Sequence, residues 1–211
     1  MKKPELETVA LRIIAGRLRS RKIHFECDRR TRPMKDRTRE AVMNLMGGTL
    51  DGMLAFDLFG GSGVMAFESI SRGAQAAVVW EILRGGATTI LKIARELGIS
   101  EDVHVLHEDI FRWSKDLSAR LASLPRIGPL VQETATEKPA WAIYCCPPYA
   151  MWDNQGAELK ELIERWYTLA PSGSLMAVEL EVRTPETWLP TGPDWDLRSY
   201  SPAKMAIAEK P

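Results

Sequence analysis

The chain has 211 residues, of which 45% are hydrophobic and 27% are charged, and its formal net charge is zero. This composition is typical of a globular protein and excludes a disordered, collagenous or coiled-coil chain. No stretch approaches the roughly 20 apolar residues of a membrane span, and charges interrupt the amino-terminal region too often for a secretory signal. We therefore expect a cytoplasmic protein, and its three cysteines, two of them adjacent, fit a reducing compartment.

The zero net charge conceals an uneven distribution. Residues 1–40 hold 13 Lys or Arg and 6 Asp or Glu, whereas residues 41–211 hold 15 and 22. A basic segment of this kind suits contact with a polyanion backbone. A solvated basic face, or one paired with the acidic remainder of the chain, explains the same counts. Charge alone therefore leaves nucleic acid as one of two open readings.

The first predicted elements are two short strands within residues 11–25. The stretches LRIIAG and KIHF flank the basic RLRSRK, which favours a hairpin or ribbon. Thr31-Arg32-Pro33 then ends extended structure. A helix is predicted from Lys35 to Met46, because its apolar positions share one face and Gly47-Gly48 follows it.

Apolar strands and amphipathic helices then alternate along the chain. The predicted buried strands are residues 53–59, 76–81, 103–109, 140–146 and 174–181, and the predicted helices are 64–73, 87–97 and 159–169. This alternation predicts an α/β fold, with a parallel sheet, right-handed crossovers and helices on both faces. The second half of residues 114–140 is predicted to be a mobile surface loop, and the tail offers two weak strands around Ser201-Pro202.

Glycines at 60, 61 and 63 follow the first of these strands and allow a sharp turn with close ligand approach. Phe67 stands near the place of a small residue in a dinucleotide fingerprint, so we expect it to hinder close helix–sheet packing. Glu81 follows Gly63 by 18 positions, where a carboxylate can accept both hydroxyls of a ribose. This spacing predicts an adenosine-containing ligand, the alternative being a plain turn followed by a surface glutamate.

Two aspartates narrow the choice of ligand. Asp57 directly precedes the glycines and suits a ligand with an ammonium group better than one with a pyrophosphate. S-adenosylmethionine carries both an adenosine and an α-amino group. Asp109, with Ile110 beside it, is then expected at the adenine edge. The alternative for Asp109 is that it caps a helix beginning at Ile110.

Pro147-Pro148-Tyr149 ends the fourth strand. Two prolines fix the backbone so that a carbonyl points into a cleft, and the aromatic ring that follows can stack on a base. The motif predicts a site for an exocyclic amine, although a rigid loop is the usual role of such a sequence. Trp152 belongs to the core or rim, or flanks a flipped base, and Cys145 is expected to be a buried small hydrophobe.

Four segments together resemble the class I S-adenosylmethionine-dependent methyltransferases, and more narrowly the RsmD-type family that methylates the guanine N2 amine of 16S ribosomal RNA. They are LRIIAGRLRSRKI, TRPMKDRTREAVMNLM, DLFGGSGVMAFESISRGA and CCPPYA, and the resemblance runs from about Leu11 to the end. It implies a Rossmann-like, seven-stranded, mostly parallel sheet with an antiparallel last strand and a small basic amino-terminal extension. We expect a basic hairpin or arm over residues 1–34 and the methyltransferase domain over 35–211.

The resemblance also implies roles for single residues. The methionine end of the cofactor is expected to bind Asp57, Gly60, Gly61 and Gly63. Glu81 is expected to bind the ribose, and Asp109 with Ile110 the adenine. Tyr149 is expected to stack on guanine, within a catalytic set completed by Cys146 and Pro147. RNA phosphates are expected to bind the basic segment, which would fold over the mouth of the site, through Arg17, Arg19, Arg21, Lys22, Arg32 and Arg37. The implied partner is ribosomal RNA or the small-subunit particle, with no metal, no membrane and a monomeric state.

One position departs from the family pattern. Cys146 stands where the family has Asp or Asn, and a thiol is a weak donor and acceptor. The enzyme is then slow but active, or it has become an RNA-binding homologue, or Cys146 has taken new chemistry such as attack on a pyrimidine carbon. Adenine-N6 methylation is the alternative reaction, because the same geometry serves any exocyclic amine.

Overall fold

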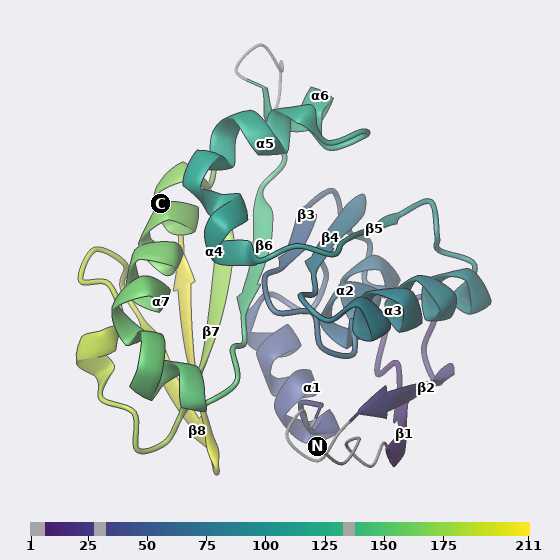
Figure 1. Cartoon of the computed structure of the whole chain (residues 1–211), viewed down its shortest axis with the longest axis horizontal. Helices are drawn as coiled ribbons and strands as arrows, with labels where there is room; N and C mark the ends of the chain where they lie inside the picture. The colour runs from purple at the N-terminus through teal and green to yellow at the C-terminus, as the bar shows by residue number, and fades with distance from the viewer. Residues whose placement is uncertain (1–6, 28–32, 133–137) are drawn as a thin grey trace.

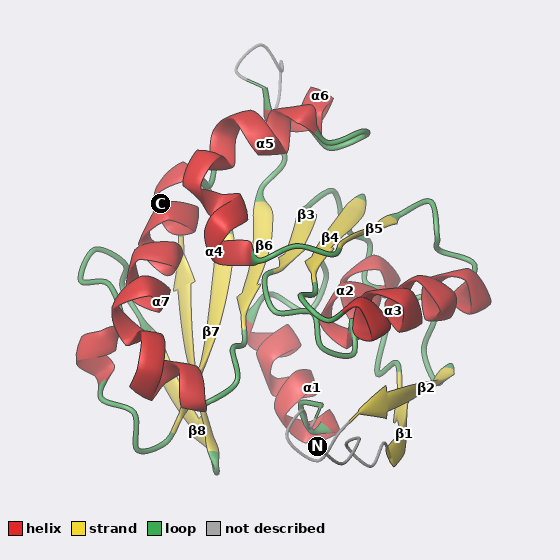
Figure 2. Cartoon of the chain, viewed as in Figure 1, coloured by secondary structure: helices red, strands yellow, loops and turns green. Residues whose placement is uncertain are grey.

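The structure is a computed structural model that describes residues 7–27, 33–132 and 138–211. The described residues form one seven-stranded sheet with helices on both faces, and a separate two-stranded hairpin lies beside it (Figures 1 and 2). In that part of the chain, no helix is both long enough and apolar enough to cross a membrane.

The sheet has the strand order β5-β4-β3-β6-β7-β9-β8. In that order the strands are Val103–Leu106, Ala76–Trp80, Leu54–Asp57, Trp141–Cys145, Leu175–Glu181, Ala203–Glu209 and Asp196–Tyr200. Neighbouring strands are parallel except at β9, which is antiparallel to both β7 and β8. The expected mostly parallel sheet with an antiparallel last strand is therefore confirmed, with β9 one place in from the edge.

Two cores cover the two faces, because side chains along each strand alternate in direction. One core combines Ala55, Ala77 and Ala142 of the sheet with the helices α1 (Asp36–Leu45), α2 (Val64–Ser71) and α3 (Arg84–Leu97). The other combines Leu54, Phe56 and Val78 with α4 (Ile110–Trp113), α5 (Leu117–Ser123) and α7 (Ala150–Leu169). The short helix η1 (Ser114–Asp116) joins α4 to α5. The central strands β3, β4 and β6 are buried along their whole length.

The α7 face is sealed by aromatic side chains. Trp80 and Trp113 lie with ring centroids 4.7 Å apart, and Phe56 lies 4.9 Å from Trp141, in edge-on geometries that favour aromatic pairs. Trp166 packs among them and donates its indole N–H to Ser114 Oγ at 3.0 Å. These rings fill the space between the sheet and α7 with buried apolar side chains.

The hairpin pairs β1 (Glu7–Arg12) with β2 (Lys22–Cys27) in antiparallel register. The first strand ends at Arg12, earlier than predicted, because the next residues pass along α2 instead. Ile14 N–H donates to Glu68 Oε1 at 2.7 Å, and Leu18 N–H donates to Ser71 Oγ at 2.9 Å. Glu68 lies in the middle of α2 and Ser71 at its end, so the connecting loop runs toward the amino-terminal edge of the sheet.

Other boundaries also differ from the predictions. Helix α7 begins at Ala150, well before the predicted residue 159, and is kinked at Gln155, where φ is −140°. Residues 114–132 contain η1, α5 and α6 (Gly128–Val131), so only part of the predicted loop is irregular. The rest of that loop includes residues 133–137, which lie outside the described residues. A short helix η2 (Glu186–Trp188) follows β7.

Candidate active site

The strand order reverses between β3 and β6, which lie side by side although β4 and β5 separate them in the chain. Ligands in such sheets bind beyond the carboxyl ends of the strands at this switch point. Asp57 ends β3, Cys146 follows β6 and Glu179 lies near the end of β7. Strand alternation directs all three toward the α1 and α2 face, alongside Ala55, Tyr144 and Ala177.

Asp57 is a buried carboxylate, with 2% of the residue exposed. Its Oδ2 has no hydrogen-bond partner among the described residues. Burial raises the pKa of Asp57 to about 8, and the nearby Glu81 carboxylate adds to this effect, while the Phe59 N–H opposes it. A buried acceptor left open at the switch point fits a cationic group of a ligand.

The glycine loop after Asp57 is as tight as predicted. A Cβ at Gly60 would lie 2.4 Å from Val79 Cγ1, and Gly63 has a φ of +73°, which favours glycine. A Cβ at Gly63 would lie 3.1 Å from the ring of Phe67, which is fully buried. The expectation that Phe67 hinders close packing is therefore wrong, because Gly63 makes room for its ring.

Glu81 joins the loop to the end of β4. Its Oε2 accepts from Gly61 N–H at 2.9 Å and its Oε1 accepts from Leu83 N–H at 2.7 Å. Burial raises the pKa of Glu81. Each oxygen keeps a second lone pair for a ribose hydroxyl. Sequence reasoning missed Gly86, where an added Cβ would lie 2.9 Å from Glu81 Cγ, although the Gly85-Gly86 pair marks the position.

Asp109 caps α4, as one of the two readings predicted. Its Oδ1 accepts from Phe111 N–H at 2.8 Å and from Arg112 N–H at 3.2 Å. Its contact with adenine stays a prediction, in which Oδ2 would be the acceptor. Ile110 is 4% exposed and packs into the core of the α7 face, so only its backbone would face a ligand. Ile82, which directly follows Glu81, is by contrast 62% exposed.

Tyr149 is half-buried, and its hydroxyl donates to Glu179 Oε1 at 2.8 Å. Trp152 donates its indole N–H to the Glu179 carbonyl at 3.1 Å and is 1% exposed. Trp152 is thus a core residue, and its predicted alternative place beside a flipped base is wrong. Glu179 was missed by sequence reasoning, although a glutamate within the apolar strand LMAVELE marks it.

Cys146 lies between two carboxylates. Burial raises the pKa of its thiol, and the negative charges of Glu179 and Asp57 raise it further. A thiol with a raised pKa is a poor source of thiolate, which argues against a nucleophilic cysteine. Burial also raises the pKa of Glu179, while hydrogen bonds from Tyr149 and Cys146 lower it. Cys145 is fully buried in the α7 core, as expected.

Three of the predicted RNA-binding residues can be placed, and they lie at two different edges of the sheet. Arg17 pairs with Asp102 at 3.1 Å, and Arg21 donates to the Glu96 carbonyl at 3.0 Å. These partners lie just before β5 and near the end of α3, at the amino-terminal edge, so the expectation that the whole basic segment folds over the mouth is wrong.

Arg37 lies elsewhere, exposed in the first turn of α1. Because the end of α1 leads into the start of β3, this first turn points to the carboxyl edge. Arg19 and Lys22 are also exposed, and Arg32 lies outside the described residues. The RNA contacts of all these residues stay predictions.

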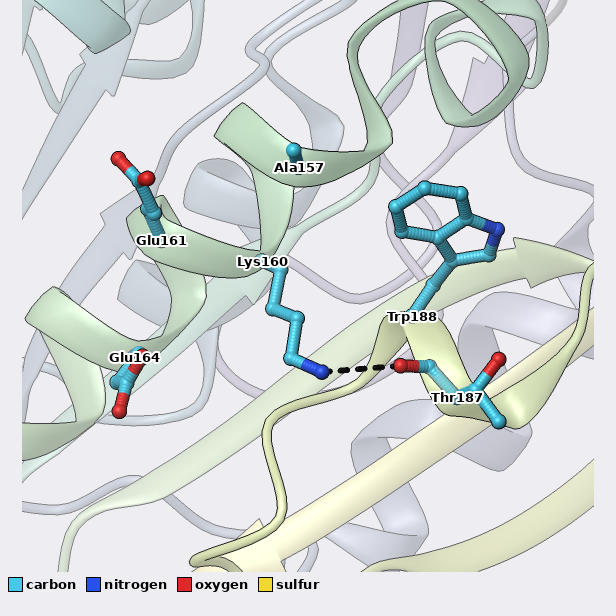
Figure 3. Close-up of a pocket in the computed structure, with 6 residues that line it drawn as sticks. All are labelled: Ala157, Lys160, Glu161, Glu164, Thr187 and Trp188. Carbon is cyan, nitrogen blue, oxygen red and sulfur yellow. Dashed lines mark hydrogen bonds between the residues drawn. The ribbon is translucent and has the colours of Figure 1, made fainter.

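Two hollows on the described surface lie away from the switch point, and one of them, of about 580 Å³, is lined by η1, α5 and α7. A hollow of about 350 Å³ lies between α7 and η2, where Lys160 Nζ donates to the Thr187 carbonyl at 3.0 Å (Figure 3). Glu161 and Glu164 point away from Thr187 there, and no strand end contributes a residue. The described residues also contain no group of three His, Cys, Asp or Glu side chains arranged to hold a metal ion.

Comparison with known proteins agrees with this geometry. The family model described as "Conserved hypothetical protein 95" matches residues 11–196. A Bacillus subtilis (strain 168) protein named "Putative rRNA methyltransferase YlbH" is 27% identical over 178 residues, which cover 84% of this chain and 87% of that protein. The Escherichia coli (strain K12) "Ribosomal RNA small subunit methyltransferase D" is 33% identical over 93 residues, which cover 44% of this chain and 47% of that protein.

A solved structure shares the fold. The protein described as "Putative methyltransferase yhhF from Escherichia coli" superposes with a TM-score of 0.73 at 20% identity, covering 96% of this chain and 98% of that chain. The family model spans most of the sequence, and the switch point holds the acidic and glycine residues that the resemblance implied. The chain therefore belongs to this family, the RsmD family of class I S-adenosylmethionine-dependent methyltransferases.

Proposed function

We propose that this chain transfers a methyl group from S-adenosylmethionine to the exocyclic N2 amine of a guanine in small-subunit ribosomal RNA. The name of the Escherichia coli relative supports the substrate, and the family supports the donor. The observation that carries the proposal is the buried Oδ2 of Asp57, which has no hydrogen-bond partner among the described residues. It lies at the switch point, one strand away from Pro147-Pro148-Tyr149.

The residues present fit the cofactor. Asp57 would accept from its ammonium group, and Gly61, where an added Cβ would meet only the Phe59 carbonyl at 3.9 Å, leaves room for close approach of the ligand. Glu81 would hold the ribose, and Asp109 Oδ2 would accept from the adenine amine. The exposed Ile82 would cover one face of the adenine. When bound, S-adenosylmethionine supplies an electrophilic methyl group on a sulfonium.

The chain's own contribution would be to position and desolvate the target base. The hydrogen bond from Tyr149 to Glu179 fixes the aromatic ring that would stack on guanine. The carbonyls of Pro148 and Tyr149 accept from the first turn of α7, which leaves the Pro147 carbonyl, among the described residues, for the target amine. Holding both reactants in line in this way is the main source of rate in a direct transfer.

The test is transfer of a tritiated methyl group to 16S ribosomal RNA and to small-subunit particles that lack the modification. Digestion to nucleosides is expected to give N2-methylguanosine. N6-methyladenosine would favour the alternative reaction. Cofactor binding without transfer to either substrate would contradict the proposal and favour an RNA-binding homologue. Asp57→Asn is the negative control. It would remove the charged partner of the cofactor and is expected to abolish most of the methyl transfer to RNA.

A further inference from the structure

The motif that departs from the family pattern has a carboxylate beside it on the next strand. Cys145 and Val178 are register partners in β6 and β7, so Cys146 and Glu179 follow as neighbours on the same face. Tyr149 connects to the same group, because its hydroxyl donates to Glu179 Oε1. Glu179 thus touches both the residue that replaces the family's acid or amide and the ring expected to hold the base.

We propose that Glu179 supplies the carboxylate that the motif lacks at Cys146, by accepting a hydrogen bond from the target amine and then its proton. This inference rests on the proposed function and assigns its proton acceptor. When the amine nitrogen is methylated, its lone pair forms the N–C bond, and the S–C bond breaks with its electron pair left on sulfur. The nitrogen then carries one proton in excess, and a Glu179 oxygen takes that proton and becomes a neutral carboxylic acid.

The surroundings of Glu179 suit this role. Its backbone is fixed by Trp152, whose indole N–H binds the Glu179 carbonyl, so the side chain has a defined origin. Burial raises its pKa, which makes the carboxylate a better proton acceptor than an exposed glutamate. The titratable groups that face it are Cys146 from the end of β6 and Tyr149 before α7, with Glu181 further along β7. Its register partner on β9 is the uncharged Met205.

A merely structural role for Glu179, orienting Tyr149, makes different predictions from a proton acceptor. Glu179→Gln keeps an oxygen that accepts from the tyrosine hydroxyl but removes the base. Tyr149→Phe keeps the ring and the base but removes the hydroxyl. We expect E179Q to lower kcat about 100-fold or more, with KM for RNA within about threefold of wild type. We expect Y149F mainly to raise KM for RNA.

The pH dependence separates the two roles further. If Glu179 accepts the proton, kcat of the wild type rises with pH as this carboxylate ionises, and E179Q loses that acidic limb while Y149F keeps it. If Glu179 only orients Tyr149, the two variants lose kcat alike and the limb survives in both. Cofactor affinity, measured by calorimetry, checks that each variant is folded and binds its donor as the wild type does.

Cys146→Asp provides a second, independent test. In the wild-type background it adds a carboxylate between Glu179 and Asp57, so we expect a lower rate. In the E179Q background the new aspartate replaces the missing base, and we expect kcat of the double variant to be at least tenfold higher than kcat of E179Q. A kcat at least tenfold above wild type in C146D alone would overturn the inference. This part of the test stays valid even if E179Q does not fold.

The outcomes distinguish this inference from the proposed function. An active wild type whose kcat changes less than threefold in E179Q contradicts the role of Glu179 and leaves the methyltransferase function in place. A wild type that binds S-adenosylmethionine but methylates no ribosomal RNA contradicts both.

Discussion

Two buried carboxylates on the same face of the sheet have opposite surroundings. Glu68 in α2 is fully buried, and its Oε1 accepts from Ile14 N–H at 2.7 Å and from Arg39 Nε at 3.1 Å. Its Oε2 has no hydrogen-bond partner among the described residues, but Arg72 Nε lies 3.6 Å away and forms an ion pair with it. Asp57 is buried almost as completely, yet it faces the like-charged Glu81 and forms no ion pair among the described residues. One carboxylate fastens the hairpin to the domain, and the other is left without a cationic partner.

The difference follows from how burial acts on charge. A buried carboxylate is costly unless cations and N–H groups surround it, and removing its partners leaves that cost uncompensated. Arg39 completes the arrangement at Glu68, because it also donates to the carbonyls of Arg12 and Met34. Asp57 has no such cation among its described contacts, so burial raises its pKa and the side chain keeps its proton at neutral pH.

The largest effect is expected from Arg39→Leu. Glu68 would lose its fully buried partner, and we expect the free energy of unfolding to fall by about 3–5 kcal/mol. Chemical denaturation measures this change. Arg37→Leu, exposed in the same helix, is the matched control and is expected to cost less than about 0.5 kcal/mol. Equal effects of the two substitutions would show that the Glu68 cluster does not anchor the hairpin.

Unlike Arg39→Leu, Asp57→Asn is expected to raise the free energy of unfolding. The pKa of Asp57 is about 8 in the folded chain, against an ordinary value of 3.8, so the folded state holds its proton between these pH values. Its contribution therefore makes the unfolding free energy fall as pH rises from about 4 to 8. We expect D57N to be more stable than wild type above pH 8, by about 2–5 kcal/mol, and to show a flatter dependence on pH. A less stable D57N at that pH would contradict an unpaired carboxylate.

Substitutions of glycine test how tightly the loop after Asp57 is packed. A Cβ at Gly60 would overlap Val79, so we expect Gly60→Ala to cost about 1–3 kcal/mol and to weaken cofactor binding. Gly85, at the start of α3, has nothing within 4 Å of an added Cβ. Gly85→Ala is therefore the matched control and is expected to stabilise the chain by about 0.5–1 kcal/mol. Thermal unfolding and cofactor calorimetry test both variants. A G60A variant with unchanged stability and cofactor affinity would contradict the close contact between Gly60 and Val79.

The smallest effects concern the two groups of basic residues. Arg37 lies in the first turn of α1, toward the carboxyl edge, whereas Arg17 pairs with Asp102 at the opposite edge. We expect Arg37→Ala to weaken RNA binding and reduce its salt dependence by about one phosphate contact. Arg17→Ala is expected to affect RNA binding less and stability by at most about 1 kcal/mol. Filter binding at several salt concentrations measures both, and a larger loss from R17A would place the RNA at the amino-terminal edge.

The sequence predicted the sheet and the tight glycine turn after Asp57, because alternating strands, helices and a glycine turn are local patterns. It did not predict Glu179, whose importance depends on the pairing of β6 with β7, nor Gly86, whose role depends on the side chain of Glu81. The expected place of Arg17 over the mouth of the site was wrong for the same reason, and the sequence alone did not choose between the two readings of Trp152, of which the core is confirmed. Which edge a loop reaches, and whether a ring points inward, are set by packing between distant segments rather than by local pattern.

The central claim is that the open carboxylate of Asp57 receives the cofactor's ammonium group. The most direct test is calorimetry of S-adenosylmethionine binding near pH 7, in two buffers that differ in ionisation enthalpy. With a pKa of about 8, Asp57 is mostly protonated before binding and must ionise to pair with the cation, so we predict that binding releases up to one proton. D57N is expected to bind about 10–100-fold more weakly and without this buffer dependence. Binding of equal strength to wild type and D57N, or no binding to the wild type, would contradict the account.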